Sequence, residues 1–251
     1  MATNIERTLT YNVLNAPLRP FPYPHIYVPE VFPPDFYAEL QRRLPHPDAM
    51  IPIEQARPVK GYKERFVMDI GGPMETLTEE QRAFWSGLAG WLLSGRFRQV
   101  MLSRFKPYVE QRFQGAQGLE FREESLLIED ITNYALGPHT DAPSKVISVL
   151  FYLPKDDSQS HMGTSIYMPK NVGRGCPGGP HYGYEGFDRV ATMPFRPNSM
   201  FAFVKSDWSF HGVEPVTDPD VRRWLLLYDI KVRQTQPAAT APGASAGAAA
   251  R

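Results

Sequence analysis

The second half of this 251-residue chain is a series of short segments rich in β-branched and aromatic residues, separated by turn-forming residues. Valine, isoleucine, tyrosine and phenylalanine favour extended strands, whereas glycine, proline, asparagine and aspartate interrupt them. The segments span residues 125–134, 146–153, 164–168, 189–193, 199–204, 209–215 and 222–230. Several short strands with turn signals between them predict a β-sandwich or jelly roll.

The first half of the chain has a different pattern. Prolines recur within residues 1–30, so we expect an extended arm that wraps around the body. A short amphipathic helix is expected between Pro34 and Pro45. A second helix begins at Thr78, which forms a capping-box pattern with the glutamine three residues later. Its glycines predict a break within residues 78–114.

These patterns divide the chain into three parts. Residues 1–119 form an N-terminal arm with supporting helices, and residues 120–234 form a β-rich core. The Ala- and Pro-rich tail, residues 235–251, has no large apolar residue to bury and is expected to be disordered. The predicted fold is therefore mainly β with N-terminal helices, in a single domain.

Charge and cysteine content argue against several classes of partner. The 27 Lys and Arg residues balance 27 Asp and Glu residues, so no basic field attracts nucleic acid or an anionic membrane. The single cysteine, Cys176, forms no internal disulfide and fits a reducing compartment. No run approaches the roughly 18 apolar residues of a membrane span, and no apolar leader is present. We therefore expect a soluble cytoplasmic protein with a small-molecule substrate; oligomeric state is not encoded in these patterns.

A metal-binding pattern lies within the β-rich half. His139 and Asp141 are two positions apart beside a Gly-Pro turn signal, and His211 lies in a later predicted strand. Residues at this spacing on an extended backbone project to the same side. A second histidine from a neighbouring strand would complete a set of two nitrogens and one oxygen, which suits non-haem Fe(II) and leaves three positions open. A solvated turn and a buried core histidine are the plain structural alternatives.

In order and spacing, the motifs of this half resemble the core of the Fe(II)- and 2-oxoglutarate-dependent oxygenases, closest to the prolyl-hydroxylase-like and phytanoyl-hydroxylase-like branches. The resemblance covers roughly residues 120–232 and rests on residues 133–141, 145–153, 198–204, 210–216 and 222–228. It implies a double-stranded β-helix, a cupin-like jelly roll, with His139, Asp141 and His211 as metal ligands and catalytic residues. It also implies Fe(II), 2-oxoglutarate and O2 as cofactor and cosubstrates. The implied reaction is hydroxylation of an unactivated C–H bond coupled to decarboxylation of 2-oxoglutarate to succinate.

The resemblance also assigns the cosubstrate-binding residues. One arginine of the adjacent pair Arg222 and Arg223 would hold the far carboxylate of 2-oxoglutarate through two parallel hydrogen bonds, while the other points outward. The distance from the second histidine favours Arg222, although a bulge would exchange the two. Tyr152 and Tyr134 resemble tyrosines that line this site in prolyl-hydroxylase-like members. Half-buried strand aromatics are the structural alternative for both tyrosines.

Substrate contacts are expected from two regions. Asp130 and Thr132 share a strand face with the earlier tyrosine, and polar side chains on an inward face indicate pocket lining. A Gly- and Pro-rich segment within residues 161–187 is expected to form a lid over the metal, with His161, Arg174, His181 and Tyr182 as polar contacts.

Two other functions remain open from the residues alone. One is a cupin-like metal enzyme that does not use 2-oxoglutarate, in which the arginine pair is structural. The other is a non-catalytic, ligand-binding jelly roll. Formation of succinate from 2-oxoglutarate in the presence of Fe(II) and oxygen separates the oxygenase from both.

Overall fold

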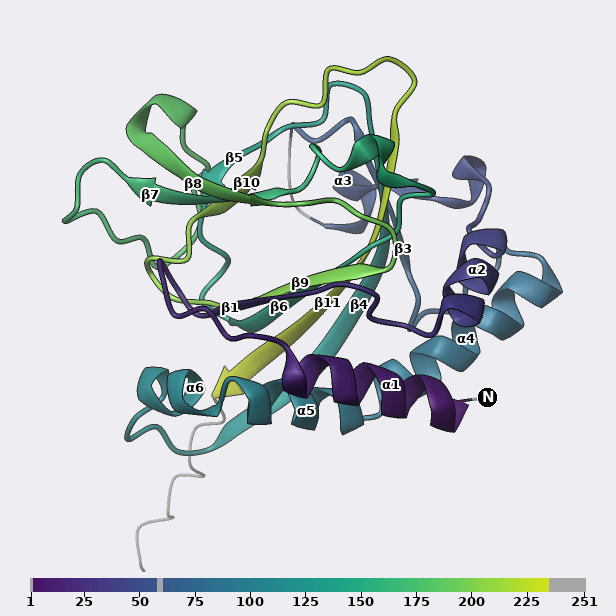
Figure 1. The fold of residues 1–251 in the computed structure, drawn as a ribbon, viewed down its shortest axis with the longest axis horizontal. Coiled ribbons are helices and arrows are strands. Elements are labelled where there is room, and N and C mark those ends of the chain that lie inside the picture. Colours follow the sequence, from purple (N-terminus) through teal and green to yellow (C-terminus); the bar gives the residue numbers. More distant parts are fainter. Residues whose placement is uncertain (1, 58–60, 235–251) are drawn as a thin grey trace, which may run out of the picture.

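Two antiparallel β-sheets face each other, and helices cover the outer face of the larger sheet (Figure 1). The computed structural model describes residues 2–57 and 61–234. Its strands are β1 (His25–Val28), β2 (Ile51–Pro52), β3 (Arg65–Asp69), β4 (Leu119–Ile131), β5 (Leu136–His139), β6 (Lys145–Tyr152), β7 (Thr164–Pro169), β8 (Phe187–Met193), β9 (Ser199–Val204), β10 (His211–Val213) and β11 (Arg222–Gln234). Its α-helices are α1 (Ala2–Asn15), α2 (Pro34–Arg42), α3 (Ile53–Ala56), α4 (Glu79–Leu92), α5 (Arg96–Arg104) and α6 (Lys106–Arg112).

The strand order identifies the architecture. The larger sheet has the order β1-β9-β6-β11-β4-β3-β2, and the smaller sheet has the order β5-β10-β7-β8. From β4 onward the chain passes back and forth between the sheets: β4, β6, β9 and β11 lie in the larger one, and β5, β7, β8 and β10 in the smaller. This alternation is that of a double-stranded β-helix, a form of jelly roll. The expected fold class is confirmed.

The core has two compartments, one on each face of the larger sheet. Leu225 of β11 packs between the sheets with Ile166 and Phe201. The next residue of the strand, Leu226, points to the opposite face and joins the side chains beneath the helices, as does Tyr228. Each fully buried large apolar side chain contributes about 1.5–3 kcal/mol of transfer free energy. The helices therefore stabilise the sheet from outside and leave the space between the sheets for a site.

The helix predictions are confirmed around α4. Thr78 caps this helix: its hydroxyl accepts a hydrogen bond from the backbone N–H of Gln81 over 3.3 Å, and the Gln81 side chain accepts from the backbone N–H of Thr78 over 3.2 Å. The expected break follows Leu92, and Gly95 separates α4 from α5 with a φ of +83°, a conformation that favours glycine. No helix among the described residues is both long and apolar enough to cross a membrane.

The N-terminal region differs from its prediction in two respects. Residues 2–15 form the helix α1 rather than an extended arm, because the prolines begin only at Pro17. Leu9 and Val13, one helical turn apart, are fully buried in the outer compartment. The same region also supplies β1, β2 and β3 to the larger sheet. The tail predicted to be disordered, 235–251, lies outside the described residues.

Candidate active site

His139, Asp141 and His211, here called the triad, come together at the smaller sheet. His139 ends β5 and His211 begins β10, and the two are direct partners in the antiparallel pairing of these strands. Asp141 follows two residues after β5 ends. One ligand atom from each side chain lies within 4.8 Å of the others, and all three residues are buried. Strand pairing thus brings the three expected residues to one point.

Hydrogen bonds on the two imidazoles leave the same nitrogen available in each. Nδ1 of His139 lies 3.0 Å from the carbonyl oxygen of Gly137, and Nδ1 of His211 lies 2.9 Å from that of Ser209. A carbonyl oxygen only accepts hydrogen bonds, so each Nδ1 carries the proton and each Nε2 keeps its lone pair. Metal-binding histidines are oriented in this way.

Asp141 is held from two sides. The Ser148 hydroxyl donates to its Oδ2 over 2.7 Å, and Nζ of Lys145 lies 2.9 Å from its Oδ1. The same Nζ lies 3.0 Å from Oδ2 of Asp229, which is also buried. Oδ2 of Asp141 is 3.9 Å from Nε2 of His211. Oδ2 is therefore the oxygen that faces a histidine, while Oδ1 faces the lysine.

The protonation states of the triad suit a metal ion. Burial and the neighbouring His211 hold the pKa of His139 well below its ordinary value, and burial lowers the pKa of His211. Burial opposes ionisation of Asp141, but Lys145 and the two histidines outweigh burial and lower the pKa of the carboxyl group. Neutral imidazoles and an ionised carboxylate are the forms that bind metal. Two nitrogens and one carboxylate oxygen fit Fe(II).

A cavity of about 90 Å³ adjoins the triad. All three triad residues line it, together with two arginines, Arg65 of β3 and Arg223 of β11. Apolar side chains such as Leu150, Phe203 and Leu225 form other parts of the wall. Apolar walls with a few convergent polar groups are typical of small-molecule sites. A ligand here would meet metal-binding atoms and guanidinium groups together.

The two arginines leave an excess of positive charge. Arg223 is completely buried; its Nη1 donates to Oδ2 of Asp130 over 2.6 Å and its Nε donates to the carbonyl oxygen of Met162 over 2.7 Å. Nε of Arg65 donates to the other oxygen of Asp130 over 2.6 Å. Nη2 of Arg223 is buried and has no hydrogen-bond partner among the residues that the structure describes. Because a buried, incompletely paired charge is costly, this end of the cavity favours an anion.

The choice between the adjacent arginines is corrected by the structure. The Arg222 side chain is 53% exposed and pairs with the buried carboxylate of Glu129, outside the cavity. Arg223 lines the cavity, as do Leu225 and Leu227 on the same face of β11. Counting residues from the second histidine favours Arg222 as the inward arginine, but a shift of one residue along a strand turns the side chain to the opposite face, and Arg223 is the one that lines the cavity. Which of the two binds a cosubstrate stays a prediction.

Tyr152 and Tyr134 are fully buried but are not among the residues that line the cavity. The Tyr152 hydroxyl donates to the Thr164 hydroxyl over 2.8 Å, and Thr164 does line the cavity. Burial raises the pKa of Tyr152 to about 12, so it stays neutral at physiological pH. The Arg65 guanidinium lies 4.3 Å above the Tyr134 ring. Direct contact of either tyrosine with a cosubstrate stays a prediction.

The side chains expected to contact substrate do not line the cavity. Both oxygens of Asp130 are engaged by the arginines. The Thr132 hydroxyl donates to the carbonyl oxygen of Asp218 over 2.9 Å. His161 is exposed and pairs with Asp218, and Arg174 lies over a tyrosine ring. Asp130 is buried behind the cavity wall as the counterion of Arg65 and Arg223, which do line the cavity. Contact of these side chains with a substrate stays a prediction.

A loop of residues 170–183, here called the covering loop, packs against the segment that carries the triad. The backbone N–H of Tyr182 donates to the carbonyl oxygen of Pro138 over 3.0 Å. The ring of His181 lies against that of His139, with centroids 4.4 Å apart. The segment predicted to be a lid begins earlier, but its first part includes the regular strand β7. The covering loop is therefore the part that could act as a lid.

Two residues at the site, Lys145 and Arg65, had no role in the sequence interpretation, and the partner of His181 was not foreseen. Lys145 lies four positions after Asp141, and this spacing of opposite charges is a signal that the sequence contains. Arg65 comes from β3, a five-residue strand that begins and ends with a charged residue and has no flanking motif. His181 pairs with Tyr62 across two loops that are distant in sequence, so only the fold brings them together.

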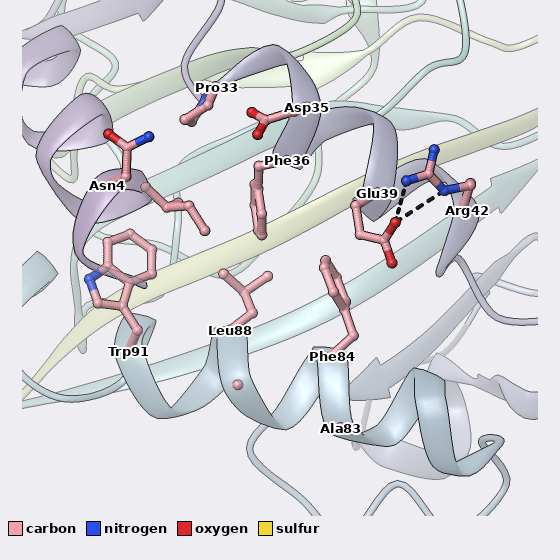
Figure 2. A pocket seen from close by; sticks show the side chains of 12 residues that line it. Asn4, Pro33, Asp35, Phe36, Glu39, Arg42, Ala83, Phe84, Leu88 and Trp91 are labelled. Carbon is pink, nitrogen blue, oxygen red and sulfur yellow. Dashed lines mark hydrogen bonds and ion pairs between the residues drawn. The ribbon is translucent and has the colours of Figure 1, made fainter. Parts of the chain in front are cut away.

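A larger cavity, about 620 Å³, lies between α1, α2 and α4, outside the sheets. Phe84, Leu88 and Trp91 project into it from α4, and Phe36 of α2 points toward them (Figure 2). No triad residue lines this groove, and the triad is the group of potential metal ligands found among the described residues. The candidate site is therefore the smaller cavity between the sheets.

Comparison with known proteins gives distant structural likenesses. No family model matches the chain, and no curated protein matches it in sequence. A prolyl-4-hydroxylase from Pseudomonas putida is similar in structure, with 16% identity, a TM-score of 0.48, and coverage of 90% of this chain and 99% of that one. A 2OG-Fe(II) oxygenase family oxidoreductase from Burkholderia pseudomallei has 15% identity, a TM-score of 0.47, and coverage of 82% and 84%.

A third similar structure is the non-haem α-ketoglutarate-dependent carbocyclase SnoK of nogalamycin biosynthesis. It has 13% identity, a TM-score of 0.49, and coverage of 92% of this chain and 85% of that one. At these identities and TM-scores the likeness is too distant to assign an activity. The function therefore rests on the residues of the site.

Proposed function

We propose that the chain is an Fe(II)- and 2-oxoglutarate-dependent dioxygenase that hydroxylates an unactivated C–H bond of a small molecule. One observation carries the proposal: the triad and a buried arginine with an unpartnered guanidinium nitrogen line the same cavity. The triad would hold the metal through two Nε2 atoms and one carboxylate oxygen. Bound iron would supply the oxygen activation that couples decarboxylation of 2-oxoglutarate to hydroxylation.

Arg223 would bind the far carboxylate of 2-oxoglutarate. A guanidinium group forms parallel, charge-assisted hydrogen bonds with a carboxylate, and Nη2 is the donor that has no other partner among the described residues. Asp130 would hold the guanidinium plane of Arg223 while Arg65 fixes the other side of the same carboxylate. The bound dianion would then neutralise the positive excess at this end and bring its keto-acid group to the triad.

The alternative functions leave the arginines unexplained. A cupin-like metal enzyme without 2-oxoglutarate would need the triad but no second anion site in the same cavity. A non-catalytic jelly roll would need neither the paired Nδ1 hydrogen bonds nor the neutral imidazoles. A guanidinium nitrogen buried without a partner is costly in both cases. The dioxygenase is the function that uses both the triad and Arg223.

The substrate would enter beside the covering loop and meet the triad within partly apolar walls. Excluding water from this space protects a reactive intermediate from side reactions. A net charge of zero supports a small molecule rather than a nucleic acid as the substrate. The single cysteine supports a cytoplasmic location.

Succinate formation tests the proposal. Purified protein with Fe(II), oxygen and 2-oxoglutarate should form succinate slowly without substrate, and faster when a metabolite library includes the substrate. Asp141→Ala should form none above the level without enzyme, because it removes the anionic ligand. A chain that binds Fe(II) tightly yet never consumes 2-oxoglutarate would favour the cupin-like alternative.

A further inference from the structure

Lys145 is fixed in position by its backbone and by two carboxylates. Its N–H donates to the carbonyl oxygen of Ala142 over 2.9 Å, which closes the turn before β6. Its carbonyl oxygen accepts from Nη1 of Arg112 over 2.6 Å. The side chain is 14% exposed, and Nζ lies 2.9 Å from Asp141 and 3.0 Å from Asp229. The lysine therefore reaches back to Asp141 from a rigid base.

The two oxygens of Asp141 have different surroundings as a result. Oδ1 is paired with the ammonium group of Lys145, whereas Oδ2 lies 3.9 Å from Nε2 of His211 and accepts from Ser148. A carboxylate with both oxygens unengaged can chelate a metal and fill two of its positions. An ammonium group on Oδ1 opposes this, because a cation on that oxygen repels a metal ion there.

We propose that Lys145 is a positioning residue that restricts Asp141 to one-oxygen coordination and thereby keeps a metal position open for the chelating cosubstrate. The inference rests on the proposed function, because it assumes Fe(II) and 2-oxoglutarate at the triad. Asp229 has a separate part: it holds the lysine from the side of β11 and balances its charge. Ligand orientation by an outer partner is common at metal sites.

A matched pair of variants separates the role of Lys145 from that of Asp229. Asp229→Asn breaks the lysine–Asp229 ion pair but keeps lysine on Asp141. The double variant Lys145→Met with Asp229→Asn also removes the lysine, and it leaves no second buried carboxylate that would oppose folding. Three properties are measured without oxygen: thermal unfolding, Co(II) affinity from visible absorption, and the half-saturating 2-oxoglutarate concentration from the Fe(II) charge-transfer band.

The Asp229→Asn variant should keep the Co(II) and 2-oxoglutarate affinities of the unmodified protein, and its melting temperature should fall because a buried ion pair is broken. The double variant should fold and bind Co(II) at least as tightly, since a nearby cation is lost. Its half-saturating 2-oxoglutarate concentration should rise about tenfold or more, the range found for outer-shell partners of metal ligands. If Lys145 had only a structural role, its removal would not weaken 2-oxoglutarate binding while leaving metal binding intact.

Two results would overturn the inference. One is a double variant that binds 2-oxoglutarate as Asp229→Asn does. The other is a double variant that loses stability, metal affinity and cosubstrate affinity together, which would make Lys145 a structural residue. Failure of the proposed function looks different, because the unmodified protein would then show no charge-transfer band at all.

Discussion

The charges near the cavity balance only when an anion binds beside Arg223. Arg65 and Arg223 share one carboxylate, that of Asp130, whereas Lys145 has two carboxylates of its own, Asp141 and Asp229. Positive charge is therefore in excess at the arginine end, and negative charge at the triad end. A metal cation at the triad and a carboxylate at the arginine would correct both imbalances. The residue types alone thus favour a dicarboxylate that also chelates a metal.

Replacement of each arginine by alanine should distinguish them clearly. Arg223→Ala removes a buried, charge-assisted partner of the cosubstrate, a loss of about 2–5 kcal/mol. The half-saturating 2-oxoglutarate concentration in succinate formation should therefore rise by more than about tenfold. Arg222→Ala, the control, removes a half-exposed side chain that does not line the cavity, so it should change this concentration little; it should lower the melting temperature, because the buried carboxylate of Glu129 loses its partner. The reverse ranking would show that Arg222 turns inward in solution.

The two arginines also show which features of the site the sequence does not predict. Types and spacing were enough to predict His139, Asp141 and His211, because three ligands of the right chemistry in strand context have few other uses. Choosing between adjacent positions requires the face of β11, and a motif distance does not determine which face points inward. Lys145 was overlooked because one of its two partners, Asp229, comes from the distant strand β11.

The covering loop owes its position to a close approach of two backbones. Gly178 has a φ of +130°, and a Cβ atom there would lie 2.4 Å from the carbonyl oxygen of Asp141. Gly179 has a similar φ of +122°, but its Cβ would meet nothing within 4 Å. The positive φ favours glycine at both positions. Only at Gly178 would a Cβ atom also collide with a neighbouring backbone atom.

This pair of glycines gives a controlled test of the loop. Gly178→Ala should displace the covering loop from the triad segment, so amide hydrogen exchange within residues 170–183 should become faster and Co(II) affinity should fall. Gly179→Ala carries the same backbone strain, about 1 kcal/mol, without the clash, and should affect both properties less. Equal behaviour of the two variants would mean that the loop is not held by this contact.

The longer elements were predictable and the short ones were not. The strands β6, β7, β8, β9 and β11 match the predicted segments closely, because turn residues bound each run of β-branched and aromatic residues. The strands β1, β3 and β5 have only four or five residues, and β5 contains the Gly-Pro pair that predicted a turn. Their pairing with longer neighbours overrides local preference. One of these short strands carries His139, so the geometry of the metal site depends on a strand that local sequence does not reveal.

The apolar core beneath the helices and the candidate site between the sheets lie on opposite faces of the larger sheet. Helices cover the outer face of the larger sheet (Figure 1) and form an apolar compartment with it, whereas the triad, Arg65 and Arg223 line the cavity between the sheets. The triad joins β5 and β10 within the smaller sheet, and Ser148 links Asp141 to β6 of the larger one. A bound metal would therefore connect two segments that are distant in the chain, residues 139–141 and His211.

Metal binding should accordingly stabilise the fold. A ligand at one hundred times its dissociation constant adds about 2.7 kcal/mol to the free energy of unfolding. For a chain of this size the melting temperature should rise by roughly 5–10 °C. Differential scanning fluorimetry with Co(II) should show this rise, and Mg(II), which prefers oxygen ligands, should not. An equal rise in His139→Ala would place the stabilising metal elsewhere.

The central claim is that the triad and Arg223 form one site for Fe(II) and 2-oxoglutarate. The most direct measurement is visible absorption without oxygen, after Fe(II) and then 2-oxoglutarate are added to the purified protein. A weak charge-transfer band should appear only when both are present, and His211→Ala should abolish it because one of the two nitrogen ligands is lost. Absence of the band in the unmodified protein, or an unchanged band in His211→Ala, would contradict the account.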